Sequence, residues 1–478
     1  MITRIIIISL FCLVIIAIGI LGMRKTKTFN DYFLGGGKIG AWMTAFTYGT
    51  AYFSAVLFIG FAGQVGWNFG ISGLWIALFN SLIGVLGVWW ILGHRIKQMS
   101  VEYKVSTLPE FFEKRYNSRG LKLYSSIAIF FLFIPYSAAV FIGLSYLFKV
   151  TFNIDYTVAL IFMGSFTGLY LVLGGYNSMT MIDVIFGIIM IIGCIVLSVT
   201  TVTAAGGITA LSDKLTQFDP KLVSVIGPAG FWNLFFLVFL TSVAPFAMPQ
   251  LIQKFYAIRD KKAVRFGMIA STLFSVLIAS TAYFVGSTSR VFLNPESAPN
   301  AFSNGKPVFD SLMPELLSKV IPEYLFVLML LLILSASMST LAAIILISSS
   351  SVVKDFYAGF INPNATDKTL TSLMRLFALI FIIISVVLAY FKPSTIVIIL
   401  GISWGAIGAA FLGPFIWGLL WKRTTLAGAF SSSVIGLGVC LYLYFTGSPS
   451  PQAGTIGMLI SFALCPLVSL VTKPKGNS

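Results

Sequence analysis

Long apolar windows, separated by short polar segments, run through the whole chain. A membrane-spanning helix needs about 20 consecutive apolar residues, and thirteen windows meet that length. They cover residues 4–23, 41–67, 70–93, 123–148, 157–174, 179–202, 229–252, 266–289, 322–350, 372–391, 394–420, 424–446 and 455–471. The pattern predicts an all-α polytopic membrane protein with thirteen transmembrane helices. The first window is longer than a signal-peptide core of about 7–15 residues, so we expect it to be retained as a helix.

The positive charges between the windows indicate an orientation. With the N-terminus outside, the inside segments and Arg375 at a helix end hold 23 of the 31 Lys and Arg, and the outside segments hold eight. Cytoplasmic loops carry such an excess of Lys and Arg. We therefore predict a multi-pass protein of the cell (plasma) membrane with the N-terminus outside and the C-terminus in the cytoplasm.

The composition excludes several classes of protein. Only 10% of the residues are charged and 58% are hydrophobic, whereas soluble domains carry about a quarter charged residues. The net charge of +16 would suggest nucleic acid as a partner of a soluble protein, but here it marks cytoplasmic loops, so no nucleic-acid partner is expected. The sequence shows no nucleophile–base pair and no metal-ligand set, which argues against an enzyme. We expect a monomer in the lipid bilayer.

Two of the windows are interrupted by residues that break helices. Gly49 and Thr50 lie in the middle of the second window, and the seventh contains Pro245 and Pro249. Proline removes a helical hydrogen bond, and broken backbone at membrane depth must line a cavity or pack against protein. Windows five apart cross in opposite directions, which matches an inverted repeat of five plus five helices around a transport site. Two unrelated kinks are the alternative.

This repeat defines the expected organisation of the chain. Residues 41–228 form the first repeat and residues 229–423 the second. Residues 1–40 are an additional N-terminal helix with a cytoplasmic loop, and residues 424–478 are two C-terminal helices and a tail.

The ninth window is rich in hydroxyl groups. Its segment SASMSTLAAIILISSSS, residues 335–351, has eight hydroxyl residues in seventeen positions. Ala336, Ser339 and Thr340 are spaced i, i+3, i+4 and share one face of the helix. Their oxygens, with carbonyls freed by a broken helix, can coordinate Na⁺. The alternative is close helix packing by small residues, which we expect for the hydroxyls of residues 348–351.

Asp183 is the one carboxylate inside a window, since the other fourteen Asp and Glu lie in loops or at window ends. A charge at membrane depth costs a few kcal/mol and usually faces an aqueous path or a partner. Its position on the cytoplasmic side suggests an exit route for a cation. An interfacial aspartate that caps its own helix is the alternative. No Lys or Arg is predicted to be buried in any window.

Several longer stretches resemble the sodium:solute symporter family, which includes sodium-coupled sugar, proline, pantothenate and monocarboxylate transporters. The resemblance runs over roughly residues 28–430 and rests on DYFLGGGKIGAW, YKVSTLPEFFEKRY, LVLGGYNSMTMIDV, MPQLIQKFYAIRDKKAVRFG, SASMSTLAAIILISSSSVVKDFY and FLGPFIWGLLWKRTTLAGAF. It implies thirteen helices, an outside N-terminus and a leucine-transporter-type core. It also implies Na⁺ ligands, namely the carbonyls of Thr50, Phe53 and Ala336 and the hydroxyls of Ser339 and Thr340, with Asp183 on the inner sodium path.

The sequence departs from the family pattern at two places. Ile182 and Phe186 flank Asp183 where the family often has threonine and glutamine. Tyr52 stands where proline symporters carry an aspartate, which argues against proline as the solute.

The solute is expected to bind beside the sodium site, between the broken helices and their neighbours. The candidate residues are Tyr48, Tyr52, Ser54, Tyr136, Ser137, Phe246, Ser403 and Trp404. The predicted function is Na⁺-coupled symport of a small organic solute by alternating access. A carboxylate such as pantothenate or a monocarboxylate, or an amino acid, fits the free N–H groups of a broken helix. A sugar or other neutral solute is the alternative, and a channel or a membrane sensor is a weaker one.

Overall fold

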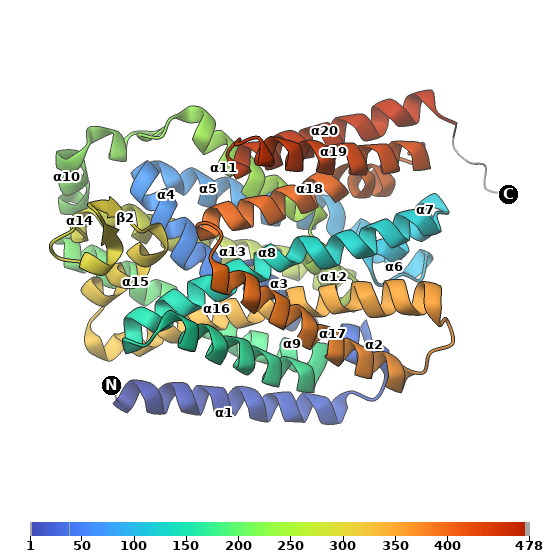
Figure 1. Ribbon diagram of the computed structural model, residues 1–478, viewed down its shortest axis with the longest axis horizontal. Helices are drawn as coiled ribbons and strands as arrows, with labels where there is room; N and C mark the ends of the chain where they lie inside the picture. Colours follow the sequence, from blue (N-terminus) through green and yellow to red (C-terminus); the bar gives the residue numbers. More distant parts are fainter. Residues whose placement is uncertain (1, 38, 474–478) are drawn as a thin grey trace.

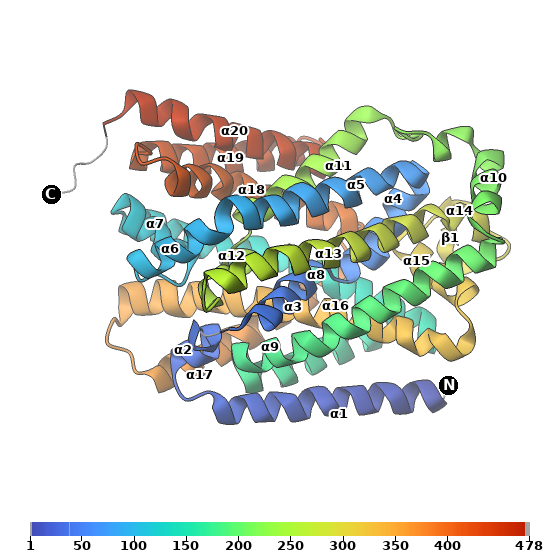
Figure 2. The ribbon, with the colours of Figure 1, turned by 180° about the vertical axis from the view of Figure 1, so that it is seen from behind.

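The apolar windows form long helices that pack side by side into one bundle (Figures 1 and 2). The computed structural model describes residues 2–37 and 39–473. The helix α1 lies along one edge of the bundle and the pair α19 and α20 along the opposite edge (Figure 1). The first residues of α1 and the last of α20 lie at opposite ends of the bundle (Figure 1).

The long helices are α1 (Ile2–Lys25), α8 (Arg119–Phe152), α9 (Tyr156–Ala205), α13 (Lys261–Ser287), α16 (Glu323–Ser350), α17 (Asp367–Phe391), α18 (Ile396–Leu420), α19 (Leu426–Phe445) and α20 (Ser450–Val471). The shorter helices are α2 (Phe29–Leu34), α3 (Ala41–Tyr52), α4 (Ala62–Phe69), α5 (Leu74–Phe79), α6 (His94–Glu102), α7 (Leu108–Tyr116), α10 (Ile208–Phe218), α11 (Phe231–Val243), α12 (Pro249–Ala257), α14 (Ser289–Phe292) and α15 (Phe309–Val320). The π-helical segments are Val56–Phe61, Asn80–Gly87, Trp89–Gly93 and Ser351–Ile361. The 3-10 turns are Gly35–Gly37, Gly70–Gly73, Pro220–Val223, Ala244–Ala247 and Pro299–Ala301. The two short strands are β1 (Phe302–Ser303) and β2 (Lys306–Pro307).

Within the described residues, ten helices are long and apolar enough to cross a membrane, or eleven if the bent pair α11–α12 counts as one span. This number is lower than the thirteen windows because some windows are broken. The helix α3 is only 12 residues long, and the apolar part of α9 before its bend is the short stretch Tyr156–Leu169. The multi-pass helical class holds, and the finer count remains a prediction.

The second window breaks three residues later than the sequence suggested. The helix α3 runs through Gly49 and Thr50, and the backbone becomes extended at Phe53 (φ −107°, ψ 136°). Gly49 has a packing role instead, because a Cβ there would lie 2.6 Å from the Phe274 ring of α13. The glycine therefore marks a close approach of two helices.

The seventh window breaks where its prolines predicted. A 3-10 turn holds Pro245, Met248 is extended, and Pro249 is the first residue of α12. Proline is well suited to that first position because its N–H has no helical partner there in any case. The two halves meet at a bend of 42°.

The windows 157–174 and 179–202 lie in one helix with a sharp bend. The helix α9 changes direction at Gly175, whose φ is 59°. A Cβ at Gly175 would lie 2.6 Å from the Tyr32 ring and 2.7 Å from the Tyr32 carbonyl oxygen. The positive φ and the contact with α2 both require glycine.

The short helix α15 is attached to the bundle by a buried carboxylate. Both Asp310 oxygens lie 3.3 Å from the Ile396 backbone nitrogen at the start of α18, where the first N–H groups of a helix lack partners. Burial raises the pKa of Asp310 to about 7, although the Ile396 N–H and the Lys392 ammonium oppose the shift.

This raised pKa gives a pH-dependent contribution to stability. Between about pH 4 and about pH 7 the folded chain retains a proton that the unfolded chain has released, so stability falls as pH rises through this window. We expect the melting temperature of Asp310→Asn to depend less on pH than that of the parent protein between about pH 5 and about pH 8. Glu323→Gln, at an exposed acid, is the control. Parallel profiles for the parent protein and Asp310→Asn would contradict this assignment.

Candidate functional site

Thr340 of α16 is the point where the broken second span meets the ninth window. Its hydroxyl lies 3.1 Å from three carbonyl oxygens, those of Ala51, Phe53 and Ala336. A hydroxyl has one proton and donates to one acceptor at a time. The cluster is therefore rich in oxygen acceptors at a point of unwound backbone, an arrangement that suits Na⁺.

Ser339 completes this cluster on the same face of α16. Its hydroxyl donates to the Thr50 hydroxyl at 2.9 Å, and Thr50 donates onward to the Phe46 carbonyl at 2.8 Å. The sequence predicted the Thr50 carbonyl as a ligand, whereas the Thr50 group that contacts α16 is its hydroxyl. The Ala51 carbonyl, which sequence reasoning missed, lies beside Thr340. The roles of these residues as Na⁺ ligands remain predictions.

The start of the second half of the broken span is already hydrogen-bonded. The Ala55 N–H donates to the Ser337 hydroxyl at 2.8 Å, and the Val56 N–H donates to the Ser54 hydroxyl at 3.2 Å. These bonds hold the break in place. They also leave fewer free N–H groups for an anion than a bare helix N-terminus offers.

Asp183 lies fully buried beside the oxygen cluster. Neither carboxylate oxygen has a hydrogen-bond partner within the described part of the chain. The groups that act on this carboxylate are the Lys254 ammonium and the hydroxyls of Ser339, Thr50 and Thr47. Asp183 therefore lies next to the predicted sodium ligands, as its assignment to the sodium path requires, and that assignment remains a prediction.

A buried cation lies two residues beyond the seventh window, where the sequence predicted a cytoplasmic loop. Lys254 belongs to α12 and is 2% exposed. Its ammonium lies 5.0 Å from the centre of the Tyr176 ring and 3.8 Å from Met179 Sδ. The charge-rich sequence after Pro249 suggested a loop, whereas the chain continues as a helix packed into the bundle. Asp355 is likewise buried, in the extension of α16, where Thr107 donates to it at 2.6 Å.

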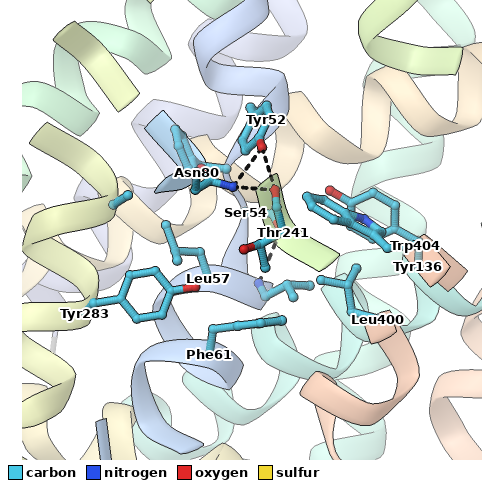
Figure 3. A pocket seen from close by; sticks show the side chains of 13 residues that line it. Tyr52, Ser54, Leu57, Phe61, Asn80, Tyr136, Thr241, Tyr283, Leu400 and Trp404 are labelled. Atoms are coloured by element: carbon cyan, nitrogen blue, oxygen red, sulfur yellow. Dashed lines mark hydrogen bonds between the residues drawn. The ribbon is translucent and has the colours of Figure 1, made fainter. Parts of the chain in front are cut away.

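A small cavity of about 40 Å³ lies at the break in the second span (Figure 3). One side carries a polar triad, in which the Asn80 amide donates to the Tyr52 hydroxyl at 2.8 Å and to the Thr241 carbonyl at 2.7 Å. The opposite wall carries Tyr136 and Trp404, whose rings meet edge to face at 5.8 Å. Asn80 Oδ1 and Trp404 Nε1 are buried and have no hydrogen-bond partner among the described residues.

Four of the eight predicted solute residues line this cavity, namely Tyr52, Ser54, Tyr136 and Trp404. The other four do not line it. Tyr48 packs against the rings of Trp89 and Phe255, and the hydroxyl of Ser403 donates to the Leu132 carbonyl. Ser137 is fully buried and Phe246 is partly buried beside Gly87.

Sequence reasoning missed part of the lining. Thr241 and Tyr283 come from α11 and α13, and the apolar wall is made by Leu57, Phe61, Ala279 and Leu400. Thr241 lies one turn before the Pro245 break, which is the signal that could have identified it. Tyr283 has no comparable signal in the sequence.

Two broken helices that enclose a cavity beside an oxygen cluster define the class of secondary active transporters. The model of the sodium:solute symporter family matches residues 32–436. The chain therefore belongs to the sodium:solute symporter family, and it is a Na⁺-coupled membrane transport protein.

Known proteins support this class over nearly the whole chain. The chain is 29% identical to the sodium/pantothenate symporter of Haemophilus influenzae, over 88% of this chain and 86% of that protein. It is 28% identical to the osmoregulated proline transporter OpuE of Bacillus subtilis, over 97% and 94%. The fold matches a solved structure of a Na⁺-coupled sialic acid symporter with a TM-score of 0.82 and 16% identity, over 98% of each chain.

Proposed function

We propose that this protein carries a small organic carboxylate into the cell together with Na⁺. The observation that carries the proposal is the Thr340 hydroxyl, 3.1 Å from carbonyls of both the broken span and α16, next to a cavity with unpaired polar atoms. Na⁺ held there would join the two elements and favour the conformation that binds the solute. Coupling then follows, because each ligand raises the affinity for the other by the same factor.

The cavity chemistry supports the choice of a carboxylate. The free Trp404 N–H is a donor for an anionic oxygen, and the free Asn80 Oδ1 accepts from a hydroxyl or an amide. The relatives named as pantothenate and proline transporters carry solutes with these groups. Because Tyr52 occupies its position with a bulky phenol bonded to Asn80, we favour pantothenate or a short monocarboxylate over proline.

The proposed site includes Na⁺ ligands at Thr50, Phe53, Ala336, Ser339 and Thr340, and Asp183 on the inner path. The proposed topology is thirteen spans with the N-terminus outside, and repeats at residues 41–228 and 229–423. The breaks at Phe53 and at Met248 support the repeat, since they fall at corresponding places. We further propose that the protein acts as a monomer and catalyses no reaction.

A thermal-shift screen of the purified protein tests the solute class. Pantothenate, lactate, proline and glucose are compared in Na⁺ buffer and in choline buffer, because a ligand that binds the folded state raises the melting temperature. We expect a Na⁺-dependent shift with a carboxylate and none with glucose, followed by Na⁺-dependent uptake of that carboxylate into proteoliposomes. A Na⁺-dependent shift with glucose alone would replace the carboxylate by a sugar.

A further inference from the structure

A second and much larger cavity adjoins the small cavity at the break in the second span. It measures about 1000 Å³ and is bounded by α4, α11, α14, α18 and the α19–α20 connection. Three helical segments line both cavities. In each segment, a residue that lines the small cavity lies about one turn from a residue that lines the large one, and the pairs are Phe61 and Gln64, Thr241 and Leu237, and Leu400 and Val397. One helical turn is about 5.4 Å, so only a thin layer separates them. Its lining residue Arg290 belongs to α14, which lies at the same end of the bundle as α10 (Figure 1), and the proposed orientation places this end outside.

Arg290 gives this outer vestibule its charge. Among the described residues of the lining it is the one with a formal charge at neutral pH, and the others are amides, hydroxyls and apolar side chains. Ion pairs within the described residues lie elsewhere, and Asp219 acts on Arg290 only through space. The vestibule therefore presents a single positive charge to whatever enters it.

The Arg290 side chain is held in a fixed position. Its Nε donates to the Trp67 carbonyl oxygen at 2.8 Å, and its guanidinium lies 4.6 Å from the centre of the Trp67 ring. The first contact satisfies a carbonyl in the last turn of α4 and uses only one of the five N–H groups. No described residue accepts a hydrogen bond from the two terminal nitrogens. A guanidinium fixed in this way suits two-point binding of a carboxylate.

We propose that the vestibule is a second binding site for the transported solute, where Arg290 receives its carboxylate before the solute passes Phe61 and Leu400. This inference rests on the proposed carboxylate symport. It assigns Arg290 to solute capture, in addition to its contact with the end of α4. The vestibule site does not need Na⁺, because its charge comes from the protein.

Chemical labelling at the vestibule tests the site without relying on transport. Ser448 lines the cavity and is partly exposed, so Ser448→Cys reports on what enters. The native cysteines are buried or half-buried, and labelling of the parent chain gives the background. We expect the ratio of labelling rates for an anionic and a cationic methanethiosulfonate to fall about fivefold or more in Arg290→Gln and to be largely kept in Arg290→Lys.

The carboxylate itself is tested by protection in Na⁺-free buffer. Pantothenate is compared with pantothenol, its alcohol analogue, on the Ser448→Cys protein. We expect pantothenate to slow labelling, pantothenol to have no such effect, and Arg290→Gln to abolish the protection. Equal protection by both compounds, or protection that survives in Arg290→Gln, would overturn the proposal.

A second variant leaves Arg290 and its contact with Trp67 intact. Ser448→Asp places a carboxylate in the same cavity, and Ser448→Asn is its neutral match. We expect Ser448→Asp to raise the solute concentration for half-maximal uptake about tenfold, with little change from Ser448→Asn, since a charge-assisted contact is weakened. Normal uptake kinetics in Ser448→Asp would overturn the vestibule site but leave carboxylate symport intact. Absence of any carboxylate uptake in the parent protein would instead reject the proposed function.

Discussion

Replacing Ser339 and Thr340 together by alanine is expected to raise the Na⁺ concentration for half-maximal uptake by about tenfold or more. Thr340 lies 3.1 Å from the Ala51, Phe53 and Ala336 carbonyls, and Ser339 contacts Thr50 at 2.9 Å. Each hydrogen-bonding contact to a charged group contributes about 1.5–3 kcal/mol, and about 1.4 kcal/mol is a tenfold change in affinity. Uptake of the identified solute into proteoliposomes over a series of Na⁺ concentrations measures the change.

The control for this double variant lies on the same helix. The Ser349 hydroxyl of α16 donates only to the Ile345 carbonyl, at 2.6 Å, so Ser349→Ala removes a hydroxyl without touching the oxygen cluster. We expect its Na⁺ dependence to match that of the parent protein. A folded Ser339→Ala, Thr340→Ala protein with unchanged Na⁺ dependence would assign both hydroxyls to helix packing.

The helical class of the protein was predictable from sequence, because runs of about 20 apolar residues are a strong signal for a helix in a bilayer. The interruptions were harder to place. The prolines located the break before α12, since proline changes the backbone directly. The break predicted at Gly49 was misplaced. A glycine in a helix marks either a break or a close contact with another helix, and only the position of Phe274 distinguishes the two.

The oxygen cluster was partly predictable, because Ala336, Ser339 and Thr340 are close in sequence and share a helix face. Helix geometry alone brings them together. Asn80, Thr241 and Tyr283 come from three different helices, so no local spacing indicates that they meet at one cavity. Arg290 was counted among the outer loop charges, and its place in the vestibule depends on how α14 packs against α4.

Lys254 shows why charge patterning fails at the end of a broken span. The charged run Arg259–Lys262 begins five residues after it, which is typical of a cytoplasmic loop. Its burial is set by α12, which packs against α3, α6 and α16. A buried ammonium is costly unless an opposite charge compensates it, and the fully buried carboxylate that acts on it is that of Asp183.

We therefore expect Lys254→Met to lower the melting temperature strongly. We expect the double variant Lys254→Met, Asp183→Asn to recover most of that loss. No direct ion pair joins Lys254 and Asp183 among the described residues, so the about 3–5 kcal/mol that follows from removing one member of a buried pair is an upper limit here. Replacing both charges by neutral residues is often nearly neutral. Thermal unfolding of the two single variants and the double variant in Na⁺-free buffer gives the coupling between the two sites.

Lys122→Met is the matched control for this cycle. Lys122 is also buried, but its partner Glu113, at 2.7 Å, keeps 26% of its side chain exposed. Water can therefore solvate the Glu113 carboxylate after the lysine is removed, so the loss should be smaller than for Lys254→Met. Additive effects of Lys254→Met and Asp183→Asn would show that the two charges are compensated separately.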